Sequence, residues 1–199
     1  IRTQRYFCKR VNATGAMTQS APSPHIALIG LMGTGKSTVG RRLANRINYD
    51  FFDTDDELQL STGRSVRDIF AIDGEEVFRD LEAQTLSAAC ARVEPLVIAV
   101  AGGGVLRRSN QLLISQMTHR IWLTADLDLI TRRVSARALT KQGHRPLIDD
   151  DPRARLTQLY SERSSVYASL ATSTVDVTDL KINEVVDALT TIVTREVAP

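Results

Sequence analysis

The sequence predicts an α/β fold in which helices cover both faces of a doubly wound, five-stranded parallel sheet. Three observations predict it. Short apolar runs typical of buried strands alternate from end to end with segments of helical periodicity, and no segment repeats another. The 199 residues suffice for one sizeable core and are few for two. With 43% hydrophobic and 24% charged residues, the composition is that of a globular protein.

The first elements are a strand and an amphipathic helix. Residues 25–31 form an apolar run that predicts a buried strand. From Lys36 onward apolar side chains recur at helical spacing, with arginines on the other side, which predicts a helix. A second strand is expected to run into the acidic residues 53–56. The helix after it, at about residues 56–62, is expected to end at Gly63, which tolerates a left-handed cap.

The middle of the chain predicts two helices and two more strands. Capping pairs, each with an acidic residue three positions later, are expected to open helices at Ser65 and at Asp73. Residues 96–101 form a continuous apolar run that ends in the glycines 102–104, so a third buried strand leads into a glycine loop. Residues 121–125 are expected to form the fourth strand.

The last third of the chain begins with a segment that lacks apolar periodicity. Residues 138–151 contain glycine, proline and three consecutive aspartates, and we expect them to form a mobile loop. A long helix is then expected at residues 156–170, a last strand at 174–177 and a closing helix at 183–195.

The first 24 residues differ from the rest of the chain. They carry four basic residues, many Ser and Thr, and no acid. This composition is typical of part of an organelle transit peptide, and equally of residues preceding a true start at Met17. We expect the second, and therefore a non-core extension at residues 1–24 and a single domain at residues 25–199.

Neither a membrane nor nucleic acid is an expected partner. The longest apolar stretch, residues 96–101, is far too short to cross a bilayer, and nothing resembles a secretory signal. Cys8 and Cys90 form no disulfide framework and have no metal-ligand spacing to a histidine, so we expect the cytoplasm, with an organelle as the alternative. The basic residues are dispersed and few aromatic residues interleave with them.

A phosphate-binding motif follows the first predicted strand. Gly30-Leu-Met-Gly-Thr-Gly-Lys-Ser37 fits the pattern G-x-x-x-x-G-K-[ST] and opens a predicted helix. Glycines let backbone N–H groups face a polyphosphate, and the helix N-terminus adds partial positive charge. Lys36 is expected to reach the outer phosphates of ATP and Ser37 to ligate Mg²⁺. The residues expected to hold the nucleotide are Gly33, Thr34, Gly35, Lys36, Ser37 and Thr38.

The type of P-loop protein follows from what accompanies the motif. A GTPase would need N-K-x-D and D-x-x-G motifs, and the chain has neither. Many P-loop ATPases end a later strand in a magnesium-binding aspartate, but here that strand ends in the glycines 102–104. We therefore expect Asp53 to supply the metal ligand.

Two carboxylates, Asp53 and Asp55, are expected on the same side of an extended segment at the nucleotide crevice. One can hold magnesium through water while the other accepts a hydrogen bond from an acceptor hydroxyl. The alternative is that these acids cap a helix or are solvated. Farther along, Arg79, oriented by Glu82, is suited to bind a carboxylate bidentately, although such a pair is often a surface salt bridge.

Together these motifs resemble those of the shikimate kinase family. They occur in family order, and the similarity covers roughly residues 25–195. It implies a P-loop kinase with a lid at about residues 138–151, which phosphorylates the 3-hydroxyl of shikimate with ATP. The motifs are the P-loop through Thr38, Asp53-Thr-Asp55, Thr62-Gly-Arg64-Ser65 with Asp68-Ile-Phe70, Gly74-Glu75 with Phe78-Arg79, Gly102-Gly-Gly104 and Arg145-Pro-Leu147.

The resemblance also implies roles for individual residues. Asp55 holds the ring hydroxyls and acts as base, and Asp53 serves the magnesium shell. Arg79, Arg163 and the amides of Gly102, Gly103 and Gly104 bind the carboxylate and ring hydroxyls. Arg145 in the lid neutralises the transferring phosphate, and Lys36, Asp55 and Arg145 are the catalytic residues. Arg132 or Arg133, with residues 178–182, flanks the adenine, and family habit implies a monomer.

The chain departs from the family pattern in two places. Where the family usually has Arg-x-Pro-Leu-Tyr, the chain reads Arg163-Ser-Ser-Val-Tyr167, which predicts a continuous helix. The adenine loop normally carries Arg and Pro, and residues 179–182 carry neither. Two alternatives stay open: a small-acceptor kinase of gluconate type, which would lack the Phe-Arg helix and the glycine triplet, and an ATP-binding module without phosphoryl transfer.

Overall fold

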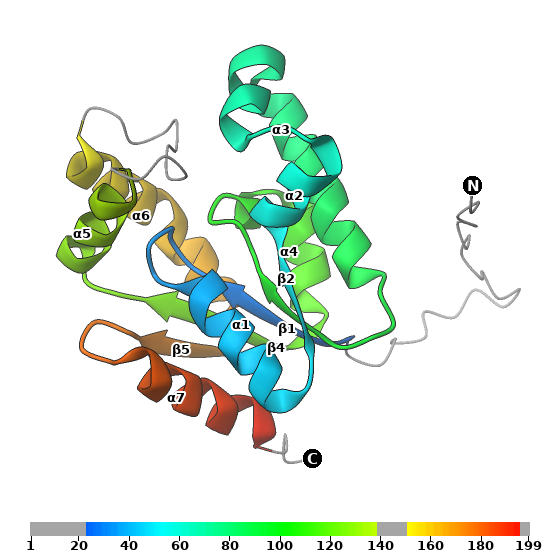
Figure 1. The fold of residues 1–199 in the computed structure, drawn as a ribbon, viewed down its shortest axis with the longest axis vertical. Coiled ribbons are helices and arrows are strands. Elements are labelled where there is room, and N and C mark those ends of the chain that lie inside the picture. Colours follow the sequence, from blue (N-terminus) through cyan, green and yellow to red (C-terminus); the bar gives the residue numbers. More distant parts are fainter. Residues whose placement is uncertain (1–22, 139–150, 196–199) are drawn as a thin grey trace, which may run out of the picture.

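The computed structural model describes residues 23–138 and 151–195. All its strands belong to one five-stranded parallel sheet in the order β2-β3-β1-β4-β5 (Figure 1). From the central β1 the chain crosses to the edge strand β2, returns to β3 beside β1, and then continues through β4 to β5 at the other edge, so the predicted doubly wound fold is confirmed. The strands are β1 (Ser23–Ile29), β2 (Asp50–Asp53), β3 (Leu96–Ala99), β4 (Met117–Thr124) and β5 (Ser173–Asp176).

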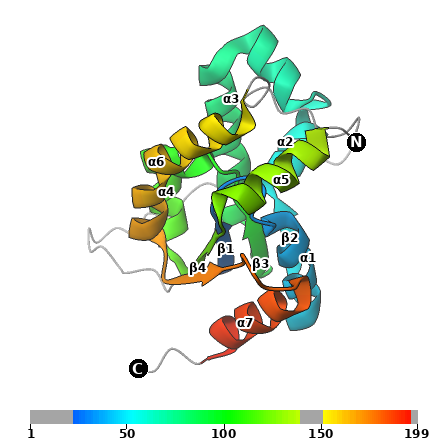
Figure 2. The same cartoon turned by 90° about the vertical axis from the view of Figure 1, so that its left-hand side faces the viewer.

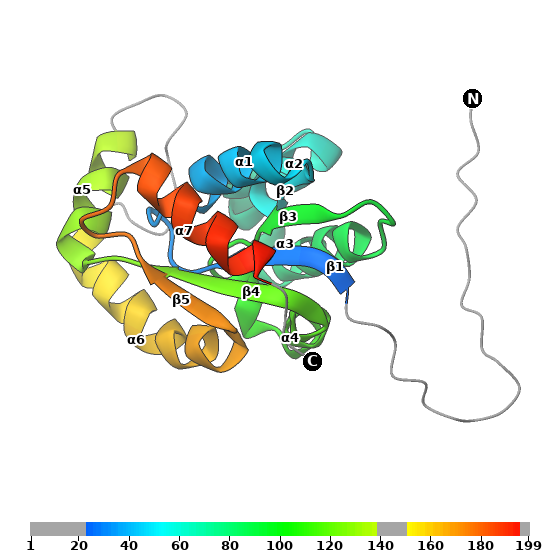
Figure 3. The same cartoon turned by 90° about the horizontal axis from the view of Figure 1, so that it is seen from below.

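Helices cover both faces of the sheet. Helices α1 and α7 lie on one face and α4 and α6 on the other, with the sheet between them (Figures 2 and 3). The sequence did not predict α4 or the 3₁₀ turn η1 that precedes it. The helices are α1 (Lys36–Ile47), α2 (Thr54–Thr62), α3 (Val66–Cys90), η1 (Gly104–Leu106), α4 (Arg108–Ser115), α5 (Leu127–Ala138), α6 (Pro152–Leu170) and α7 (Ile182–Thr194).

The two helices expected from the capping pairs are the two halves of α3. Gly74 interrupts the helix with φ 85° and ψ 173°. The Ser65 side chain caps the first half, because its oxygen accepts a hydrogen bond from the Asp68 N–H at 3.1 Å. The Asp73 carboxylate instead accepts a bond from Arg64 at 2.6 Å, so it braces the α2–α3 turn.

Helix α2 and the N-terminal part of α3 form a lobe beyond the edge of the sheet, with a small apolar core of its own (Figure 1). Leu58, Ile69 and Phe78 are buried in it. The C-terminal part of α3 packs into the main core through Leu86 and Ala89. The Phe70 ring packs on Phe78 with centroids 4.5 Å apart, and the Arg79 guanidinium carbon lies 5.3 Å from the Phe78 ring centroid. The Phe78 ring, backed by Phe70, therefore lies beside the Arg79 guanidinium.

His25 lies inside β1 and is buried. Its Nδ1 accepts a hydrogen bond from the Leu96 N–H at 3.2 Å, so this nitrogen must be unprotonated. The ring also bonds the backbone of Cys90 and Arg92. Burial outweighs these two bonds and lowers the pKa of His25 below its ordinary value. The histidine thus joins β1 to the turn that leads into β3.

Acidification is expected to weaken the fold through this histidine. A group whose pKa is lower in the folded chain binds fewer protons there, so its contribution to stability is complete above pH 6.5 and is lost as the pH falls through the folded-state pKa. We expect the urea midpoint of wild type to fall more between pH 7.5 and 5.5 than that of His25→Gln. Equal falls in the two proteins would contradict this role. His119→Gln should also reduce the fall, because burial and the charge of Arg120 lower the pKa of that half-buried histidine too, so the two variants together divide the acid sensitivity between the two histidines.

Candidate functional site

The phosphate-binding loop connects β1 to α1. At Gly30, φ is 136°, and a Cβ there would lie 2.3 Å from the Leu123 carbonyl oxygen, so only glycine fits. The Lys36 Nζ donates hydrogen bonds to the carbonyl oxygens of Gly30 and Leu31 at 2.8 and 2.9 Å. The lysine therefore lies folded over its own loop, at the N-terminus of α1, where an anion is favoured.

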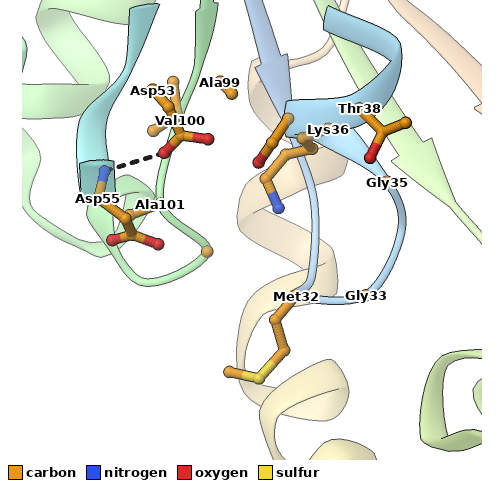
Figure 4. A pocket seen from close by; sticks show the side chains of 12 residues that line it. Met32, Gly33, Gly35, Lys36, Thr38, Asp53, Asp55, Ala99, Val100 and Ala101 are labelled. Carbon is orange, nitrogen blue, oxygen red and sulfur yellow. Dashed lines mark hydrogen bonds between the residues drawn. The ribbon is translucent and has the colours of Figure 1, made fainter. Parts of the chain in front are cut away.

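A pocket opens between this loop and the carboxyl ends of β2 and β3 (Figure 4). The P-loop lines one wall, and Asp53 and Asp55 line the opposite wall. This confirms that the two carboxylates and the P-loop face one crevice. The lining residues are Met32, Gly33, Gly35, Lys36, Ser37, Thr38, Asp53, Asp55, Ala99, Val100, Ala101 and Gly102.

Asp53 also caps α2, which corrects two expectations. Its Oδ1 accepts hydrogen bonds from the N–H groups of Asp55 and Asp56 at 3.0 and 3.4 Å. Helix α2 therefore starts at Thr54 rather than near Asp56, and the two carboxylates do not lie on one extended segment. They still meet in the pocket, and Figure 4 shows the other Asp53 oxygen on the side of the P-loop.

Thr54, between the two carboxylates, fastens β2 to β3. Its side chain is buried, and its hydroxyl accepts a hydrogen bond from the Ala101 N–H at 2.9 Å and lies 3.4 Å from the Ala99 carbonyl oxygen. The hydroxyl thus fixes the carboxylate wall against the strand that carries the glycine triplet. This role could not be predicted from the sequence, because a threonine between two aspartates does not by itself indicate a hydrogen bond to a neighbouring strand.

Arg79 lies against the glycine triplet. A Cβ at Gly103 would be 2.4 Å from Nη1 of Arg79, so any larger residue there would displace this guanidinium. Arg79 donates to Glu82 at 2.7 Å and to Glu75 at 3.1 Å. The expected orientation of Arg79 by Glu82 is confirmed, and the alternative of a solvated surface pair does not hold, because the Glu82 side chain is only 4% exposed.

The charged side chains around Glu82 influence its ionisation. Burial raises the pKa of Glu82, while Arg79 and Arg163 oppose the rise and the charge of Asp55 adds to it. Burial alone would lower the pKa of Arg79, but its two glutamate partners outweigh burial and raise it. Asp55 and Arg79 therefore act on the same buried carboxyl group and lie on the same side of the molecule.

Arg163 and Tyr167 reach the triplet from α6. Arg163 is buried, and a Cβ at Gly102 would lie 3.5 Å both from its Nη1 and from the Tyr167 hydroxyl. The helix runs through both residues without a break, as the replacement of the family proline by Ser165 predicts. No role for Tyr167 was expected from the sequence.

Two arginines on α5 and Thr34 in the P-loop are the other described residues expected to contact the nucleotide. Arg132 is exposed on α5, while Arg133 donates a hydrogen bond to the Gly33 carbonyl oxygen at 3.3 Å. Thr34 is buried, and its hydroxyl donates to the Leu31 carbonyl oxygen at 2.8 Å, so it stabilises the loop from inside. Arg145 lies outside the described residues.

Two oxygen donors in the pocket match the expected magnesium ligands. Ser37 and Asp53 stand on opposite walls, and hydroxyl and carboxylate oxygens are the donors that Mg²⁺ prefers. Within residues 23–138 and 151–195 no three His, Cys, Asp or Glu side chains cluster as a preformed metal centre. Two protein ligands completed by water and phosphate oxygens are what Mg²⁺ takes in kinases.

Comparisons with known proteins point to one family. A family model described as shikimate kinase matches residues 32–194. The shikimate kinase of Zymomonas mobilis is 44% identical over 156 residues, which are 76% of this chain and 85% of that protein. The solved structure of shikimate kinase from Acinetobacter baumannii in complex with shikimate superposes with a TM-score of 0.79 at 28% identity, over 90% of this chain and 97% of that one.

A kinase of the alternative type is more distant. A gluconokinase from Sinorhizobium meliloti has a TM-score of 0.54 at 19% identity, over 87% of this chain and 94% of that one. At this identity the likeness concerns the fold alone.

Proposed function

The chain belongs to the shikimate kinase family, and from this premise we propose that it transfers the terminal phosphoryl group of ATP to the 3-hydroxyl of shikimate. One observation carries the proposal. The P-loop, the Asp53–Asp55 wall and Gly102 line a single pocket, and the same glycine triplet contacts Arg79 and Arg163. A site for phosphates and a site for a carboxylate thus adjoin.

The nucleotide side follows from the loop. The Lys36 ammonium and the N-terminus of α1 supply positive charge for the outer phosphates. Ser37 and Asp53 are the residues that would hold magnesium, which supplies charge neutralisation on the phosphates when bound. Arg133, bonded to the loop at Gly33, or its neighbour Arg132 would flank the adenine, together with residues 178–182.

On the acceptor side, some residues bind the substrate and one takes part in the reaction. Arg79 and Arg163 bind the carboxylate, and the amides of the triplet help to fix the ring. Asp55 then accepts the hydrogen bond, and finally the proton, of the hydroxyl that attacks phosphorus. Little covalent chemistry is needed from the protein, because phosphoryl transfer depends mostly on position and charge neutralisation.

Three further assignments rest on the family resemblance. Arg145 neutralises the charge on the phosphoryl group in transit, as part of a lid at about residues 138–151. The protein acts as a monomer in the cytoplasm, with residues 25–199 as one kinase domain.

In the part of the chain that the structure describes, no helix has both the length and the apolar character needed to cross a bilayer.

A coupled assay of ADP release tests the proposal. With ATP and magnesium we expect turnover with shikimate, none above background with gluconate and none without acceptor, because shikimate holds its carboxylate and hydroxyls on one rigid ring whereas gluconate is an open chain. Turnover with gluconate alone would favour the alternative kinase. ATP binding without turnover on either acceptor would favour the inactive module.

A further inference from the structure

The hydroxyl of Tyr167 lies at the centre of the acceptor side although the side chain is fully buried. Tyr167 is 0% exposed, and its ring packs against Trp122 with centroids 5.9 Å apart. Its hydroxyl donates a hydrogen bond of 2.6 Å to the carbonyl oxygen of Gly102. The residue therefore has two parts: a ring that belongs to the core, and an oxygen that touches the glycine triplet.

The same oxygen contacts Arg163. Arg163 lies one helical turn before Tyr167 on α6, so their side chains share a face. Burial raises the pKa of Tyr167 to about 12, and a hydrogen bond from Arg163 opposes the rise. At neutral pH the hydroxyl therefore keeps its proton and donates it to Gly102, while its oxygen lies beside the Arg163 guanidinium at the same glycine. One oxygen links the two groups assigned to the acceptor.

The buried Arg163 guanidinium needs a neighbouring polar group. Its residue is only 4% exposed, and its Nε has no hydrogen-bond partner among the described residues. A buried guanidinium with a missing partner is unfavourable, and a bound carboxylate would relieve this cost. The Tyr167 hydroxyl at Gly102 and the charge of Glu82 are the neighbouring groups that favour the guanidinium in this place before a carboxylate binds.

We propose that Tyr167 is a positioning residue of the acceptor site, whose hydroxyl holds Arg163 and the Gly102 carbonyl in the arrangement that receives the carboxylate of the substrate. This inference rests on the proposed function, because it assumes that Arg163 and the triplet bind the acceptor. Tyr167 is not one of the residues that line the pocket between the P-loop and Asp53.

Tyr167→Phe tests the proposal, because phenylalanine keeps the ring and removes only the oxygen. We expect KM for shikimate to rise about tenfold, the cost of one hydrogen bond to a charged group, while KM for ATP stays at the wild-type value. The matched control is Tyr160→Phe, which removes the hydroxyl of a half-buried tyrosine on the same helix. An unchanged KM for shikimate, or equal rises for both substrates, would overturn the proposal.

A binding measurement separates this failure from failure of the proposed function. Trp122 is the single tryptophan of the chain and neighbours Tyr167, so its fluorescence reports shikimate binding without turnover. In Tyr167→Phe the Kd should rise by the same tenfold factor. If wild type fails to bind or phosphorylate shikimate, the proposed function is wrong; if it does both and the variant matches it, only the role of Tyr167 is wrong.

A double variant tests whether the effect passes through Arg163. Arg163→Lys should raise KM for shikimate by itself, and adding Tyr167→Phe should then raise it by clearly less than the factor seen in the wild-type background. Full multiplication of the two factors would overturn the link between the hydroxyl and the guanidinium.

Discussion

Asp55→Asn is expected to lower kcat about a hundredfold to ten-thousandfold and to leave ATP binding nearly unchanged. Asp55 lines the pocket opposite Lys36 and Ser37, at the place where an acceptor hydroxyl meets the phosphates. An amide cannot take the proton of that hydroxyl, and loss of a general base costs a factor of this size. Stopped assays of shikimate phosphorylation give kcat, and titration with ATP gives the binding constant.

Asp56→Asn is the matched control for this result. It removes the same charge one residue later in the first turn of α2, but its exposed carboxylate faces Arg41 and is not part of the pocket lining. Near-normal kcat is expected for the control. If Asp55→Asn retained the wild-type rate, Asp55 would have no part in the transfer.

Arg79→Lys is expected to raise KM for shikimate about tenfold to a hundredfold. The guanidinium donates hydrogen bonds to Glu82 and Glu75 from two nitrogens, at 2.7 and 3.1 Å, and lies against Gly103. An ammonium ion keeps the charge but not the planar fork, so it cannot hold the buried Glu82 and a substrate carboxylate together. Steady-state kinetics with varied shikimate measure the effect.

The control for Arg79 is Arg67→Lys, an exposed arginine in the first half of the same helix. KM for shikimate should stay at the wild-type value there, and KM for ATP should stay so in both variants. A KM for shikimate that did not change in Arg79→Lys would mean that Arg79 only braces Glu82.

The fold could be predicted because its signals are local. The strands β1 and β3 are buried on both faces, so each is a continuous apolar run that ends in glycine. The P-loop is equally local, since its backbone requires a glycine at position 30. Helix α4 was missed because only its packing against the sheet distinguishes its short apolar stripe from a loop.

The site was predictable only where its charged residues carry motifs. Asp53, Asp55 and Arg79 could be found because they belong to the motifs Asp53-Thr-Asp55 and Phe78-Arg79, which occur in family order after the P-loop. Tyr167 and Thr54 could not, because each makes its decisive hydrogen bond to backbone more than forty residues away in the chain. In sequence a buried tyrosine is indistinguishable from a core aromatic residue.

The most direct test of the account is an experimental structure of the protein with ADP, magnesium and shikimate bound. We predict the shikimate carboxylate within hydrogen-bond distance of Arg79 and Arg163, and a ring hydroxyl on Asp55 facing the P-loop. Shikimate bound with its carboxylate away from both arginines, or with no hydroxyl at Asp55, would contradict the account.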